Sequence, residues 1–229
     1  MVSVDTVYQT VLAILNKENR GYMTPQEYNL LANQAQNEIF EQYFYDLNQH
    51  NRRGEINNEF ANIIQNIKEK IDLFKVQEFQ LTYFNSSYEL PDNLYRLGSV
   101  QYGYTEIEQV NSKEFLYILN SPLTAPSESY PVYIRTDNKI EVYPASIVQE
   151  VSCNYVRTPA TVNWTYKTVN GTALYNPSST DHSNFELHPS EEVTLVNKIL
   201  TLAGVIIKQA DITQIGEAKD TKKITQEKS

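Results

Sequence analysis

The chain is 229 residues long, carries a formal net charge of −9 and contains a single cysteine. That length allows one or two domains. The acidic charge argues against a protein that grips free nucleic acid, because such affinity comes mostly from Lys and Arg side chains that displace counterions from phosphates. A lone cysteine excludes an intrachain disulfide and a cysteine-based zinc site.

Helical spacing dominates the first third of the chain. Apolar residues recur at steps of three and four over about residues 3–17, and again from about Ile56. The longest such pattern lies between them, over 21–48, and Thr24-Pro25-Gln26-Glu27 at its start is typical of a capping box. Four polar residues, Asn29, Gln36, Asn37 and Glu41, are expected mostly off the buried stripe. The stripe itself is expected to comprise Tyr28, Leu31, Ala32, Ala35, Ile39, Tyr43 and Leu47.

From about Leu73 to Tyr175 the apolar period is nearer two, which predicts strands. One expected hairpin joins 132–135 to 140–143. A second joins 164–169 to 172–175, and Asn170-Gly171 supplies the positive φ angles of a type I′ turn. A short helix is expected over 111–119.

A last helix is expected from about Pro189 to Ile215, with a wide apolar face that belongs in a core. Beyond Gly216 the chain is polar and charged, so it cannot bury enough surface to fold alone. We expect a flexible arm there, whose interface residues are Lys222, Lys223 and Ile224.

These patterns predict an α+β fold, in which antiparallel N-terminal helices pack with the long C-terminal helix beside a central antiparallel sheet or sandwich. The expected parts are a helical part over 1–84, a β-rich part over 85–188, the C-terminal helix over 189–215 and the arm over 216–229. No membrane partner is expected, because the most apolar window, 199–207, is far shorter than the ~20 residues of a membrane span. Asp5 near the N-terminus also argues against a signal peptide.

The best candidates for chemistry are Asp181, His182, Glu186 and His188, which in principle could bind a divalent metal. Their spacing matches no standard ligand motif, and a polar segment leading into a helix explains them equally well. We therefore expect no bound metal, no cofactor and no catalytic residue.

Other titratable residues have simpler explanations. Glu38 and Glu41 have no Glu-x-x-His partner of the kind found in helix-bundle metal sites, so a solvated helix face is expected. His50 is expected to interact with carbonyl groups at a helix end. Cys153 is expected to be an inert strand residue.

Several local patterns resemble virion proteins. The N-terminal Asn19-Arg20-Gly21-Tyr22 and Thr24-Pro25-Gln26-Glu27-Tyr28-Asn29 resemble the start of structural proteins from crAss-like phages of Bacteroidetes hosts. The run Tyr88-Glu89-Leu90-Pro91-Asp92-Asn93-Leu94-Tyr95-Arg96-Leu97 is similar to a strand entry in the head-to-tail adaptors of short-tailed phages. So are Ile140-Glu141-Val142-Tyr143-Pro144 and Tyr155-Val156-Arg157-Thr158-Pro159, and the patterns follow one another in the expected order.

This resemblance implies a non-enzymatic subunit of a ring, commonly twelvefold, in the neck between portal and tail. Its implied partners are copies of itself, the portal protein and neighbouring neck or tail rings, and genomic DNA would pass through the channel without specific binding. It implies synthesis in the host cytoplasm and a final place in the virion. The long loop over 176–184 departs from simple adaptors and leaves the ring level open.

Two alternatives remain open. One is a tail-associated carbohydrate-binding or host-recognition module, with Trp164 and exposed tyrosines as stacking platforms. The other is a metal-dependent enzyme that uses His182 and His188. Ring formation with a portal, glycan binding and metal content respectively distinguish the three functions.

Overall fold

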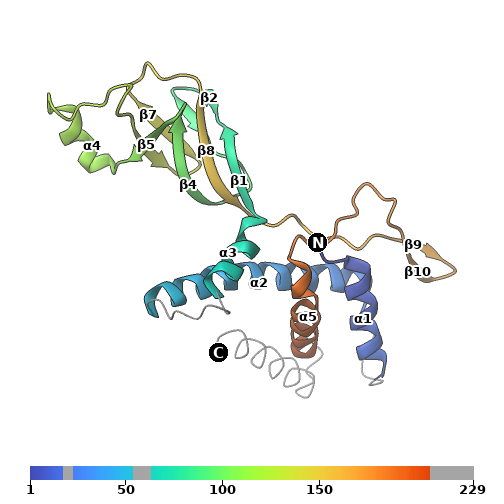
Figure 1. The fold of residues 1–229 in the computed structure, drawn as a ribbon. Coiled ribbons are helices and arrows are strands. Elements are labelled where there is room, and N and C mark those ends of the chain that lie inside the picture. The colour runs from blue at the N-terminus through green and yellow to red at the C-terminus, as the bar shows by residue number, and fades with distance from the viewer. Residues whose placement is uncertain (18–22, 54–62, 207–229) are drawn as a thin grey trace. The chain divides into compact units, whose positions relative to one another are not determined.

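A computed structural model describes residues 1–17, 23–53 and 63–206 (Figure 1). The chain divides into two compact units. The first, here called the helical unit, contains Met1–Leu73 and the chain from Pro159 onwards, and the second, the barrel unit, contains Phe74–Thr158. The α+β class predicted from the sequence is confirmed.

The helical unit is built from α1 (Val4–Lys17), α2 (Pro25–Arg53), α3 (Ile63–Asp72) and α5 (Glu192–Ile206). The short 3-10 helix η1 (Pro189–Glu191) leads directly into α5, and the hairpin of β9 (Tyr166–Val169) and β10 (Thr172–Tyr175) belongs to the same unit. As expected, α5 packs against both α1 and α2. Its buried residues are Leu195, Val196, Asn197, Ile199, Leu200, Ala203 and Gly204.

The capping box at the start of α2 is confirmed. Thr24 N donates to Glu27 Oε2 at 2.8 Å, and Glu27 N donates to Thr24 Oγ1 at 3.3 Å. The hydrogen bond from the Thr24 backbone, with a second one from its hydroxyl, lowers the pKa of Glu27. The expected apolar stripe is buried except for Leu47, which is half-buried. One prediction is wrong: Gln36 is among the residues expected off the stripe, yet only 1% of it is exposed.

The barrel unit holds one sheet whose strands are β1 (Lys75–Gln80), β2 (Thr82–Phe84), β3 (Ser87–Glu89), β4 (Leu94–Tyr102), β5 (Thr105–Gln109), β6 (Val132–Thr136), β7 (Lys139–Tyr143) and β8 (Val151–Arg157). Their order across the sheet is β1-β8-β4-β5-β6-β7-β3-β2. Neighbouring strands in this described sheet run antiparallel, apart from β5 and β6, which pair in parallel. The sheet is therefore mixed at one position, where the sequence predicted an antiparallel one.

A single bent segment joins the two ends of this sheet. β1 and β2 stand at opposite ends of the strand order, yet only Leu81 separates them along the chain. Leu81 N donates to Val151 O at 2.9 Å, which continues the β1 pairing with β8 up to the bend. The sheet thus curls into a barrel (Figure 1), and its main apolar cluster is made by Leu81, Tyr88, Leu90, Val100, Ile107, Tyr133, Ile140, Val142, Ile147, Val151, Cys153 and Tyr155.

The unit boundaries differ from those expected. Residues 74–84, expected in the helical part, open the barrel as β1 and β2, because β1 pairs with β8. Residues 159–188, expected in the β-rich part, belong to the helical unit, because side chains of α2 bind their backbone. The end of the last expected helix, 207–215, and the arm over 216–229 lie outside the described residues.

Candidate interaction surface

The two histidines of the candidate metal cluster make separate local contacts. His182 Nε2 lies 3.2 Å from the Tyr175 hydroxyl oxygen, and its Nδ1 is buried without a hydrogen-bond partner in the described structure. His188 precedes η1, where its Nδ1 accepts from Ser190 N at 3.2 Å. His188 therefore acts as an N-cap, which fits the polar lead-in expected from the sequence.

The two acidic residues of the same loop also serve the local fold, Asp181 through its backbone and Glu186 through its carboxylate. The Asp181 backbone carbonyl accepts from Asn163 Nδ2 at 3.0 Å. Glu186 Oε2 accepts from Ala160 N at 2.8 Å. Among the residues that the structure describes, no three His, Cys, Asp or Glu side chains are grouped so that they could hold a metal ion.

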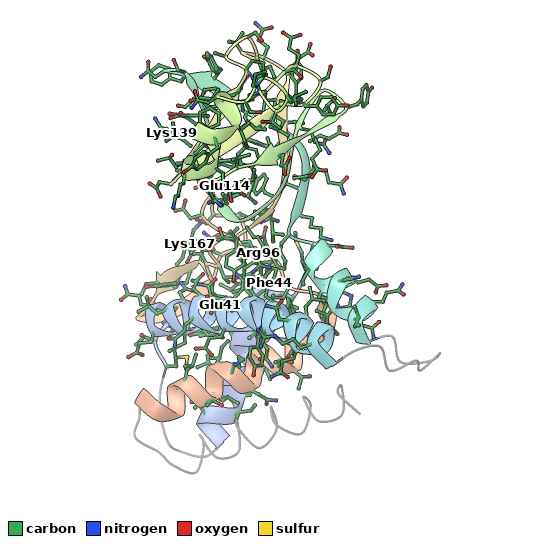
Figure 2. The ribbon with its side chains drawn as sticks, turned by 90° about the vertical axis from the view of Figure 1, so that its left-hand side faces the viewer. Glu41, Phe44, Arg96, Glu114, Lys139 and Lys167 are labelled. Atoms are coloured by element: carbon green, nitrogen blue, oxygen red, sulfur yellow. The ribbon has the colours of Figure 1, made fainter. Side chains whose placement is uncertain are left out.

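The remaining titratable candidates are Glu38, Glu41, Cys153 and His50. On α2, Glu38 Oε2 lies 3.4 Å from Lys198 Nζ of α5, whereas Glu41, labelled in Figure 2, is exposed. Cys153 lies in β8 and is 1% exposed, and this burial raises the pKa of its thiol to about 11. A buried thiol with such a pKa is a weak nucleophile at neutral pH. The His50 side chain, and the expected interface residues Lys222, Lys223 and Ile224, lie outside the described part of the chain.

A ladder of three side-chain amides on α2 was not predicted. Asn29, Asn33 and Gln36 follow one another at helical spacing and bind the backbone of the extended segment 160–164. Asn29 pairs with Trp164 and Asn33 with Val162, in each case by accepting from the backbone N–H and donating to the carbonyl. Gln36 Nε2 donates to the Ala160 carbonyl at 2.9 Å.

This ladder explains why polar residues lie on a packed face of α2. Where segment 160–164 packs against α2, its backbone N–H and C=O groups lose contact with water and need hydrogen-bond partners. Amides at the first, fifth and eighth positions of a helical run share one face, as alternate residues of a strand do. The helical spacing of Asn29, Asn33 and Gln36 was the sequence signal that could have indicated this ladder. It was not sufficient alone, because the backbone that these amides bind lies far along the chain.

Trp164 is a core residue. Its indole Nε1 donates to Asp5 Oδ1 at 2.8 Å, and its ring centroid lies 4.2 Å from that of Tyr8. Only 1% of the residue is exposed. Trp164 therefore does not offer the stacking platform that the carbohydrate-binding alternative required of it, since a platform must be open to the ligand.

Several exposed apolar residues of the barrel unit lie close together along the chain, in α4 (Ser112–Leu119) and the loop that follows it. Phe115 faces inward and packs with Val110, Val132 and Ile134. The outward residues, here called the α4 patch, are Leu116 (61% exposed), Tyr117 (72%), Leu119 (46%), Leu123 (96%) and Tyr130 (81%). Five large apolar side chains exposed within fifteen residues favour a protein-protein contact over ordinary surface.

The charge of this region also suits contact between acidic proteins. Residues 110–131 contain one basic residue, Lys113, and two acidic ones, Glu114 and Glu128, so their net charge is −1 within a chain of −9. Figure 2 labels Glu114 on α4. Low charge together with tyrosine is typical of the centre of an interface. The structure therefore points to the α4 patch as the candidate site.

Comparison with known proteins adds no family to this picture. A scan against protein-family models found no match, and a search of the curated proteins found no relative. None of the described helices is both long and apolar enough to cross a membrane.

Proposed function

We propose that this chain is a structural subunit of a ring in the neck of a short-tailed bacteriophage particle, between the portal and the tail. The observation that carries the proposal is the α4 patch, because its five exposed apolar side chains need a protein partner to be removed from water. The resemblance of the sequence to head-to-tail adaptors and crAss-like virion proteins supplies the identity of the assembly.

The charge of the chain supports the same proposal. Two copies that each carry −9 repel one another over most of their surfaces. They can approach where the charge is low and the surface is apolar, as at the α4 patch. Repeated head-to-tail contacts of this kind close into a ring when the rotation between subunits allows it. An acidic ring would also let DNA pass without holding it.

The test is assembly with the portal protein of the same phage. The purified chain, mixed with purified portal, should form rings on the portal that electron micrographs resolve, and the chain should be present in purified virions. A chain that stays unassembled with the portal and is absent from virions would overturn the proposal. Specific binding on a glycan array without portal binding would instead favour the host-recognition module.

Variants of the α4 patch distinguish a specific ring contact from non-specific association of exposed apolar residues. Tyr117→Ser together with Leu123→Ser removes two exposed apolar groups without opening a cavity, so folding should be unchanged while ring formation weakens. The matched control is Val148→Ser, which changes an exposed apolar residue of the same unit outside the patch. Ring formation should be indistinguishable between this control and the unaltered chain.

A further inference from the structure

The hairpin of β9 and β10 is a second candidate for assembly contacts. In the described part of the chain each of these strands pairs only with the other, so both outer edges of this small sheet are open. In the barrel, by contrast, the bent segment through Leu81 joins the two ends of the sheet. A two-stranded hairpin is marginally stable by itself, and a further strand stabilises it.

The base of the hairpin is fixed while its tip is exposed. Tyr166 and Tyr175 form the base and both stack on Trp164, with ring centroids 5.8 Å away. Lys167 and the other residues up to Thr172 are exposed, and Figure 1 shows the hairpin apart from the helices of its unit. An arm that is anchored in this way loses little conformational entropy when it binds.

The pairing pattern shows which backbone groups point outward. Asn176 N donates to Thr165 O at 2.8 Å, so this pair is hydrogen-bonded across the hairpin. Hydrogen-bonded and non-hydrogen-bonded pairs alternate along an antiparallel ladder. Thr168 and Ala173, three steps further along, therefore form a non-hydrogen-bonded pair whose N–H and C=O groups face the open edges.

The charge of the hairpin selects a partner. Residues 166–175 contain one Lys and no acidic residue, so two hairpins escape the repulsion that acts between the acidic remainders of two copies. Pairing β9 with β9 of a second copy would bring two Lys167 side chains together. Pairing β9 of one copy with β10 of the next brings Lys167 beside uncharged residues and keeps the strands antiparallel.

We infer that the hairpins of adjacent copies join edge to edge, with β10 of one copy beside β9 of the next, into a continuous antiparallel sheet around the ring. This inference rests on the proposed ring function, and its occupant is a second copy of this chain. Strand addition of this kind draws its affinity from main-chain hydrogen bonds.

The test blocks the outer edge while leaving the hairpin intact. Proline at an edge position removes only an outward N–H, so Thr168→Pro should keep the β9–β10 pairing. It should raise the subunit concentration needed for half-maximal ring formation on the portal by about fivefold or more, because each junction loses a main-chain hydrogen bond. Thr168→Ala, the matched control, should stay within about twofold, since its N–H remains. Equal melting temperatures for the two variants would show that Thr168→Pro has not unfolded the subunit.

Crosslinking identifies the partner directly. A photoreactive p-benzoylphenylalanine at position 168 should link two copies of the chain in assembled rings, detected with two copies that carry tags of different mass. The same group at Asn85, in the β2–β3 turn of the barrel, should give no such product. Crosslinks from position 168 to the portal alone, or unchanged ring formation by Thr168→Pro, would overturn the hairpin pairing while leaving the ring function standing. If the unaltered chain forms no ring at all, the ring function itself fails.

Discussion

The Asn33 side chain pairs with the Val162 peptide in both directions: Val162 N donates to Oδ1 and Nδ2 donates to Val162 O, each at 2.8 Å. The two residues lie 129 positions apart in the sequence. A side-chain amide offers a donor and an acceptor in the same arrangement as a peptide group. Helix α2 therefore serves segment 160–164 as a neighbouring strand would, and holds the chain where it returns from the barrel unit.

The first prediction concerns this pair. Asn33→Ala should lower the free energy of unfolding by about 2–3 kcal/mol, because it leaves a buried N–H and a buried C=O without partners. Urea denaturation followed by far-UV circular dichroism measures the change. Asn37→Ala is the control, since Asn37 is exposed on the same helix and its removal should cost at most about 0.5 kcal/mol. Equal costs for the two variants would contradict the structural role of the amide.

The second prediction concerns the ion pair between Lys70 of α3 and Glu191 of η1. Their Nζ and Oε1 atoms lie 2.7 Å apart, and the Glu191 side chain is 4% exposed. Glu191→Ala should lower the free energy of unfolding by about 3 kcal/mol, because a partly buried lysine loses its carboxylate. Glu192→Ala removes an exposed carboxylate one residue later and should cost less than about 1 kcal/mol. A double-mutant cycle with Lys70→Ala should show a coupling energy, and additive effects would argue against the pair.

The third prediction separates the two faces of α4. Phe115→Ala should destabilise the barrel unit by about 3 kcal/mol, because Phe115 is buried against a small apolar cluster. Leu116→Ser changes the next residue, which is 61% exposed, so it should alter stability by less than about 0.5 kcal/mol. The same Leu116 variant should reduce ring formation on the portal. Thermal melting and ring assembly are measured on both variants. A destabilised Leu116→Ser, or a Phe115→Ala of unchanged stability, would contradict this division.

Local signals in the sequence predicted local structure well. Thr24 and Glu27 lie three residues apart, and their capping box forms as the pattern indicates. Asn170 and Gly171 adopt φ angles of 50° and 79°, as a type I′ turn requires. These features depend on neighbours along the chain, so composition and spacing were sufficient to find them.

The features that the sequence did not predict depend on contacts between residues far apart along the chain. Closure of the barrel depends on the hydrogen bond from Leu81 N to Val151 O. The unit boundary depends on the hydrogen bond between Val162 and Asn33. Trp164 illustrates the same limit for the site, because an aromatic residue beside a hairpin suits a stacking platform or a core, and only its contact with Asp5 and Tyr8 decides between them. The α4 patch was missed because the exposed side of a short apolar helix depends on which residues the sheet covers.

The last prediction concerns alkaline pH. Burial raises the pKa of the Cys153 thiol to about 11, whereas an unfolded thiol titrates near pH ~8.5. Between these values the unfolded chain releases a proton that the folded chain keeps, so stability falls as pH rises through this window and is unaffected by this group below it. Raising the pH from 8 to 10 should therefore cost about 1–2 kcal/mol through this thiol. Burial raises the pKa of Tyr88 from its ordinary value of 10.0 to about 12, so the loss of stability through this tyrosine begins only near the upper end of this pH range. Urea midpoints at pH 8 and 10 should thus differ more for the unaltered chain than for Cys153→Ala, and an equal pH dependence would show that the thiol titrates alike in both states.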